Sequence, residues 1–170
     1  MSVLTREVIL AEIASGRLNI DPFSPEQLGA ASIDLTLGDE IRVFESSDGP
    51  IDLREDADYR DHTQLHRLDE PYVLVPGCTI HGITRERVCL PVNICGFLEG
   101  RSRFARLGLM IHVTAGFVAP GVDSRQVLEM SNVSTHPLAI HAGVRVCQLV
   151  LERCEGSAIY TGRFANQDRL

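Results

Sequence analysis

The second half of the chain, from Tyr72 to Cys154, consists of short apolar runs separated by turn signals. The runs read YVLV, CTIHGIT, RVCLP, NICGFLE, LMIHVTAGFV, RQVLEMSNV and LAIHAGVRVCQLVLERC, and the turns fall at Pro76-Gly77, Pro120-Gly121 and His136-Pro137. Runs of this length, rich in β-branched residues, are typical of β-strands. Many short strands and few helices predict a mainly β fold, which is a sandwich, a jelly roll or a barrel.

The first half adds a few local elements. Residues 5–14 (TREVILAEIA) predict a short amphipathic helix with Thr5 as its N-cap and Gly16 as its stop signal. The sequence SPEQ at 24–27 has the capping-box pattern of a brief helical turn. Apolar and polar residues alternate in ASIDLTLGDEIRVF at 31–44, which is the period of a half-buried strand.

The segment 45–70 is polar, strongly acidic and without periodicity, so we expect a surface excursion. His62 and His66 are four residues apart and would share a helix face, where they could bind a metal. No third ligand accompanies them in the sequence, and a solvated loop is the favoured interpretation.

Length and composition describe an ordinary globular chain. The 170 residues fit a single domain over 1–170, large enough to fold without disulfides or metal. Five cysteines, an odd number without CxxC spacing, are expected to be buried thiols. There is no apolar run of membrane-spanning length and no signal-peptide pattern, so a cytoplasmic protein is expected.

The charges favour a small anionic ligand. A net charge of −7 argues against a nucleic-acid-binding surface. Lysine is absent, and all 16 basic residues are arginine, the side chain best shaped for bidentate phosphate contacts. Arg101, Arg103 and Arg106 form a local basic cluster in this acidic chain.

Several familiar site types are excluded by their motifs. The sequence has no GxGxxG, no Walker A motif and no GxSxG elbow. The HxE and PCxxC elements of the zinc nucleobase deaminases are absent as well. Any deamination by this chain would therefore proceed without zinc.

Three pieces of the β-rich half could carry chemistry. The turn GRSRFAR at 100–106 follows a strand and offers phosphate a helix N-terminus, or it is a solvated basic turn. Glu129 lies within the strand-like run RQVLEMSNV, so its carboxylate is either paired with an arginine or kept for proton transfer. The small residues of HVTAG at 112–116 would let a flat base approach the backbone.

GRSRFARLGLMIHVTAG, APG, VLE and GVRVCQLV occur in this order, after an N-terminal ASIDLTLGDEIRVF. Together they resemble the dCTP deaminases and the bifunctional dCTP deaminase/dUTPases over nearly the whole chain except 45–70. The resemblance implies a distorted β-barrel or jelly roll of the dUTPase-like type with short helices. It also implies a homotrimer with nucleotide sites between subunits and a C-terminal tail, 156–170, that covers the nucleotide.

The resemblance also assigns roles. Glu129 matches the catalytic glutamate, and Ser102 and Arg106 match the residues that orient the water and offset charge on the ring. Substrate-binding positions would be Arg101, Arg103, Thr114, Ala115, Ala119, Val127, Leu128, Gln148, Tyr160 and Gln167. The implied ligands are dCTP or dUTP, with Mg²⁺ accompanying the triphosphate, no zinc site, and dTTP as an inhibitor.

Three positions depart from the family pattern. Ala119 stands where an aspartate usually holds the sugar hydroxyl, Arg103 replaces a serine, and the residues 121–124 differ from the usual aromatic and glycine. An active deaminase that makes dUTP, a non-catalytic nucleotide-binding or regulatory paralogue, and a deaminase with changed nucleotide preference all stay open. dUTP hydrolysis alone is disfavoured, because Ala119 lacks the carboxylate.

Overall fold

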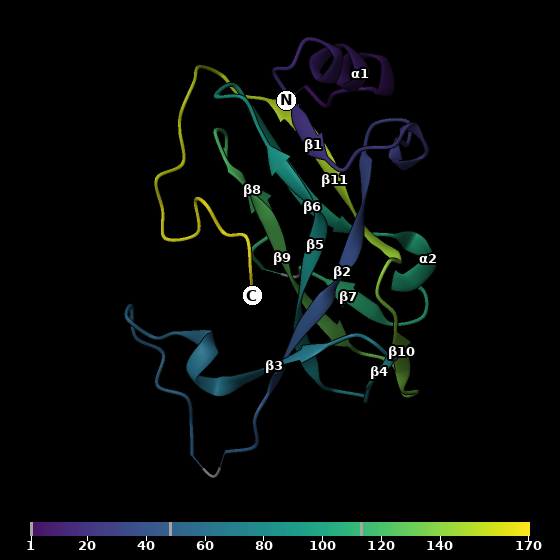
Figure 1. The fold of residues 1–170 in the computed structure, drawn as a ribbon, viewed down its shortest axis with the longest axis vertical. Helices are drawn as coiled ribbons and strands as arrows, with labels where there is room; N and C mark the ends of the chain where they lie inside the picture. Colours follow the sequence, from purple (N-terminus) through teal and green to yellow (C-terminus); the bar gives the residue numbers. More distant parts are fainter. Residues whose placement is uncertain (1, 48, 113) are drawn as a thin grey trace.

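The structure, a computed structural model, describes residues 2–47, 49–112 and 114–170. Within these residues nine strands form one curled antiparallel sheet in the order β7-β9-β5-β2-β11-β6-β8, with β1 on β5 and β3 on β2 (Figure 1). Strands β4 and β10 form a separate pair. The mainly β prediction is confirmed.

The helical segments are α1 (Arg6–Ala14), η1 (Pro25–Gln27), η2 (Tyr59–His62) and α2 (Ser102–Ala105). The strands are β1 (Asn19–Asp21), β2 (Ile33–Phe44), β3 (Thr63–Arg67), β4 (Tyr72–Leu74), β5 (Thr79–Cys89), β6 (Ile94–Gly100), β7 (Leu109–Ile111), β8 (Phe117–Val118), β9 (Asp123–Asn132), β10 (Leu138–Ile140) and β11 (Arg145–Arg153).

The core lies on one face of the curled sheet. Strand alternation sends Ile33, Leu35 and Leu37 of β2 into it with no exposed surface. Leu128 and Met130 of β9 join them, each completely buried. The residues between these positions on β9 therefore face the other way, and this second face carries the site described below.

Most strand predictions are confirmed, with three changes of boundary, one of which divides the run LAIHAGVRVCQLVLERC into β10 and β11. The runs CTIHGIT and RVCLP form one continuous strand, β5, because both pair with β9 across a register shift. The run LMIHVTAGFV is divided into β7 and β8. His112 has a φ of 53°, outside the β region, so the chain leaves the strand there.

The segment 45–70, the expected surface excursion, contains regular structure. Strand β3 pairs with β2, with Thr63 opposite Phe44 and Arg67 opposite Glu40, and η2 precedes it. Because only Thr63 of this strand is buried, the sequence has no alternation to reveal it. The described residues contain no group of three or more His, Cys, Asp or Glu side chains placed to bind a metal ion.

Not every cysteine is a buried thiol. Cys95 and Cys147 are buried and Cys89 and Cys154 partly so, but Cys78 is exposed, which corrects the prediction for that residue. No helix in the described part of the chain is long and apolar enough to cross a membrane.

Helix α1 is attached to the sheet by one buried carboxylate. The side chain of Glu12 is 3% exposed; its Oε1 accepts from Nη2 of Arg153 on β11 at 2.6 Å and its Oε2 from Nε of Arg17 at 2.8 Å. The bond from Arg17 is the main reason that the pKa of Glu12 lies below its usual value, and burial opposes it. Glu12 therefore holds α1 against β11.

Substituting Glu12→Gln should lower the free energy of unfolding by about 2 kcal/mol, since two charge-assisted hydrogen bonds weaken. The depressed pKa means that this contribution is present above the unfolded value of 4.5 and is lost as the pH falls through the folded value. Urea unfolding at pH 7 measures the difference, with Glu7→Gln as control because Glu7 is exposed on the same helix. Equal destabilisation by the two variants would contradict the role of Glu12.

Candidate functional site

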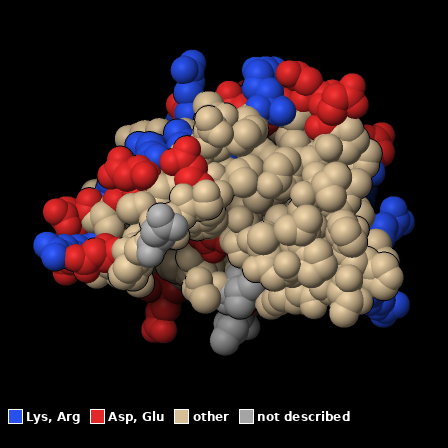
Figure 2. Space-filling model, turned by 90° about the horizontal axis from the view of Figure 1, so that it is seen from below, with Lys and Arg blue, Asp and Glu red and all other residues tan. Residues whose placement is uncertain are grey.

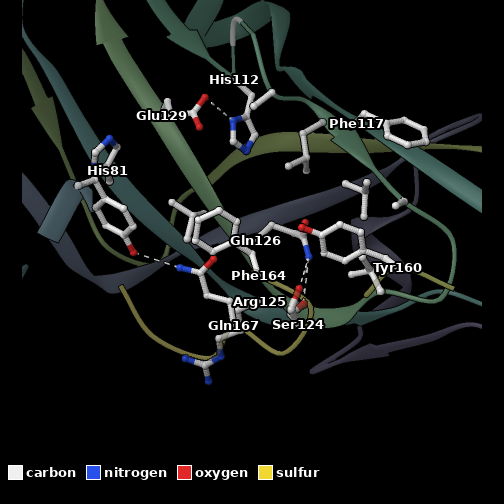
Figure 3. Close-up of a pocket in the computed structure, with 17 residues that line it drawn as sticks. His81, His112, Phe117, Ser124, Arg125, Gln126, Glu129, Tyr160, Phe164 and Gln167 are labelled. Carbon is white, nitrogen blue, oxygen red and sulfur yellow. Dashed lines mark hydrogen bonds and ion pairs between the residues drawn. The ribbon is translucent and has the colours of Figure 1, made fainter. Parts of the chain in front are cut away.

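A cavity of about 570 Å³ lies against the second face of β9. Residues of β5, β6 and β8, of the turns after β7 and β8, of η2 and of the C-terminal tail line the rest of it (Figure 3). The size suits a small organic ligand. Most lining groups are apolar, and Glu129 is the only carboxylate among the described residues that line it. A pocket of this kind is the default candidate for an active site.

Glu129 is bonded to an imidazole inside this cavity. Its Oε2 lies 2.9 Å from Nδ1 of His112, whose side chain is 5% exposed (Figure 3). The backbone N–H of His112 also donates to the carbonyl of Glu129 at 3.1 Å, so the turn after β7 is fastened to β9. The hydrogen bond from His112 is the main cause that lowers the pKa of Glu129, against the effect of burial. Glu129 is therefore a carboxylate at neutral pH, as a general base must be.

A second imidazole flanks the carboxylate. His81 lies on β5 directly opposite Glu129 on β9 and is 9% exposed. Tyr59 of η2 meets the His81 ring edge-on, with ring centroids 5.2 Å apart. Burial lowers the pKa of His81, so the ring is neutral at pH 7.

Residues of the C-terminal tail line one side of the cavity. The backbone N–H of Arg125 on β9 donates to the carbonyl of Gln167 at 2.9 Å, and Nε2 of Gln167 donates to the hydroxyl of Tyr59 at 3.2 Å (Figure 3). Tyr160 is held by a backbone bond to Pro120 at 3.0 Å. The predicted substrate-binding residues that line this cavity are Ala115, Ala119, Val127, Tyr160 and Gln167.

A second cavity of about 690 Å³ collects another part of the predicted site. Arg101, Ser102, Arg103 and Gln148 line it together with Asp34. Arg101 is already paired, with Asp34 at 2.9 Å and the carbonyl of Arg145 at 2.7 Å. Burial raises the pKa of Asp34, and the charge of Arg101 opposes this rise. A phosphate group would therefore compete with Asp34 for Arg101.

Three predicted residues line neither cavity. Leu128 lies in the core, because its neighbours Val127 and Glu129 take the cavity face of the strand, so its predicted place beside the base is wrong. Arg106 and Thr114 are exposed on the surface. Glu129 and Ser102 thus belong to different cavities, and the three predicted catalytic residues do not converge within one chain.

Among the lining residues that sequence reasoning missed, three surround Glu129 and its partners: the imidazoles of His81 and His112 and the ring of Tyr59. His112 was expected only as part of a small-residue stretch, and Tyr59 was assigned to a solvated excursion. The register of β5 against β9 would predict that His81 lies opposite Glu129, but the sequence of one strand does not determine its register against another.

The chain is mainly β and carries a half-buried carboxylate, bonded to a buried imidazole, in a cavity of about 570 Å³. A family model described as dCTP deaminase-like matches residues 3–154, and the chain belongs to this family. It is 38% identical to the "dCTP deaminase, dUMP-forming" of Acidothermus cellulolyticus over 97% of this chain and 91% of that protein. The protein of the same name from Methanobrevibacter smithii is 36% identical, over 89% of this chain and 80% of the relative.

Solved structures support the fold. The 2′-deoxycytidine 5′-triphosphate deaminase of Agrobacterium tumefaciens superposes with a TM-score of 0.70 at 22% identity, covering 90% of this chain and 48% of that one. A mutant dUTPase of Staphylococcus bacteriophage 80alpha superposes with a TM-score of 0.51 at 16% identity, covering 86% and 96% of the two chains. The expected dUTPase-like type of fold is thereby confirmed.

Arg87 of β5 fastens the tail over the cavity, since its guanidinium contacts Asp168 of the tail and bonds to Asp123 of β9 at 2.6 Å. Arg87→Gln should increase the open fraction of the tail about five-fold, the effect of losing an ion pair worth about 1 kcal/mol. Trypsin should then cleave after Arg163 faster in proportion, as followed by mass spectrometry. Arg85→Gln, an exposed position on the same strand, is the control. Equal cleavage rates in both variants would rule out the fastening.

Proposed function

We propose that this chain catalyses the zinc-independent hydrolytic deamination of dCTP. The observation that carries the proposal is the Glu129 carboxylate, held by an imidazole at the wall of a largely apolar cavity of nucleotide size. The names of the curated relatives give the reaction class, and deamination of dCTP is common to them.

Glu129 supplies the acid–base chemistry. Its carboxylate takes a proton from water as the oxygen forms a bond to C4 of the cytosine ring, and it returns the proton to the amine as the C4–N bond breaks and ammonia leaves. Val127 lies beside Glu129 on the same face of β9, and the small side chain of Ala115 lets the base approach the backbone. General acid–base help of this kind is worth roughly 10² to 10⁴ in rate.

A homotrimer with shared sites completes the proposal. Ser102 lies in the second cavity, so an arrangement that joins the second cavity of one subunit to the first of another would unite it with Glu129. In Figure 2 the right-hand part of the face carries few charged side chains, and it lies on the side of the molecule where β4 and β10 are in Figure 1. Val73 of β4 is 55% exposed and Val75 after it is 48% exposed. Exposed apolar surface of this kind favours an interface between subunits.

The substrate would be the Mg²⁺ complex of dCTP. No group of three or more potential ligand side chains lies in the described residues, so the phosphate oxygens would supply most ligands of the ion. In a trimer, Arg101 and Arg103 would meet the phosphates. dTTP, which offers the same triphosphate, is the expected inhibitor.

The direct product would be dUTP. Release of pyrophosphate to give dUMP needs a second general base, and Ala119 puts a methyl group on the cavity wall where the family pattern has an aspartate. dUMP is the second candidate product, because the curated relatives are named dUMP-forming. The two products separate readily by anion-exchange chromatography.

Ammonia release from dCTP with Mg²⁺ tests the proposal, with CTP and dUTP as parallel substrates. The parent should release ammonia from dCTP, and Glu129→Gln should lower the rate by roughly 10³ because the proton carrier is lost. Glu99→Gln, a carboxylate on β6 that lines neither cavity, should leave the rate unchanged.

Each alternative has its own result in the same assay. Release from CTP in place of dCTP would mean that Ala119 has changed the sugar preference. Nucleotide binding without turnover of any substrate would favour the non-catalytic paralogue and sink the deaminase. If dUMP and pyrophosphate appear, the product is dUMP and not dUTP.

A further inference from the structure

Three polar side chains form a row across the cavity face of the sheet. Arg42 of β2 lies opposite His81 of β5, and His81 lies opposite Glu129 of β9. Directly opposed residues on antiparallel strands point to the same face with Cβ atoms about 4.5 to 5.5 Å apart. A change of side-chain rotamer is therefore enough to bring the Glu129 carboxylate to the imidazole of His81.

The row contains unused hydrogen-bonding capacity. In the described part of the chain, two buried side-chain nitrogens lack a hydrogen-bond partner, Nδ1 of His81 and Nε of Arg42. Unpartnered buried polar atoms are rare, and each calls for an explanation. Phe44 and Tyr59 hold the His81 ring edge-on, each with centroids 5.2 Å apart, so the imidazole is fixed in place without being used.

We propose that His81 is a positioning residue. Its imidazole forms a hydrogen bond to the Glu129 carboxylate when this carboxylate leaves His112 to take the proton of the attacking water. The inference rests on the proposed deamination, in which an Oε2 bonded to His112 is less able to accept the proton of the attacking water. A second imidazole opposite keeps the carboxylate partnered and oriented while Oε2 is free.

The surroundings of His81 suit this role. The charged and titratable groups that face it are Glu129 from β9, His112 from the turn after β7, and Arg42 from β2. Phe44 from β2 and Tyr59 from η2 supply the aromatic contacts. Burial lowers the pKa of His81, so near neutral pH the ring is uncharged and can donate one hydrogen bond to the carboxylate without forming a tight ion pair.

An NMR titration of the parent protein labelled with ¹⁵N-histidine tests the pairing without turnover, with His81 assigned from the spectrum of His81→Phe. His112→Gly removes the present partner, and glycine tolerates the φ of 53°. The His81 titration midpoint should then rise by roughly half a pH unit or more, as the carboxylate turns to it. Adding Glu129→Gln should abolish the rise. An unchanged midpoint in His112→Gly overturns the proposal, whatever the activity of the parent.

Kinetics on dCTP give the functional readout. His81→Phe should lower kcat about ten-fold with KM within about three-fold, and the acid limb of its pH profile should move to higher pH, because Glu129 loses a hydrogen-bond donor. His81→Asn, which keeps a donor, should restore part of kcat. A folded His81→Phe variant with the kcat and pH profile of the parent overturns the role. A parent without ammonia release refutes the deaminase, and the titration then decides the pairing alone.

Discussion

The antiparallel pairing of β5 with β9 is the constraint from which the candidate site follows. It buries Leu128 and Met130 in the core and, because side chains alternate, turns Glu129 to the opposite face. The same register sets His81 beside the carboxylate. A slip of one residue would exchange the two faces and place a carboxylate in the core, so the energetics of the core also fix the position of Glu129.

The residues that surround Glu129 come from different parts of the chain. The turn that ends β7 brings His112, the short 3₁₀ helix η2 within the acidic segment brings Tyr59, and the tail brings Gln167. A separate cavity is lined by Arg101, Ser102 and Arg103, and there Asp34 already pairs with Arg101. A nucleotide whose base lies in the first cavity and whose phosphates lie in the second would need both, which is the physical basis for the proposed site between subunits.

Particular residues show which parts of the fold and of the candidate site the sequence predicts. Alternation at Ile33, Leu35 and Leu37 predicts β2. The position of Glu129 within an apolar run predicts a carboxylate that is either paired or kept for proton transfer. Both predictions depend only on local periodicity. Strand β3 was missed because it depends on pairing with β2, and Tyr59 was missed because its place depends on contact with the tail. No local sequence pattern encodes either contact. Leu128 was misplaced because the resemblance gave a neighbourhood without the direction of each side chain. The family resemblance supplied the reaction, and chain folding alone does not bring Ser102 to Glu129.

Mixing the variants Glu129→Gln and Ser102→Ala, each of which lacks one of the proposed catalytic side chains, tests most directly whether Glu129 and Ser102 act together across a subunit interface. After dissociation and reassembly, with subunit exchange checked by native mass spectrometry, some sites would combine an intact Glu129 with an intact Ser102 from another subunit. Random assembly predicts about a quarter of the parent rate of ammonia release from dCTP. A mixture that exchanges subunits and stays inactive would contradict the shared site.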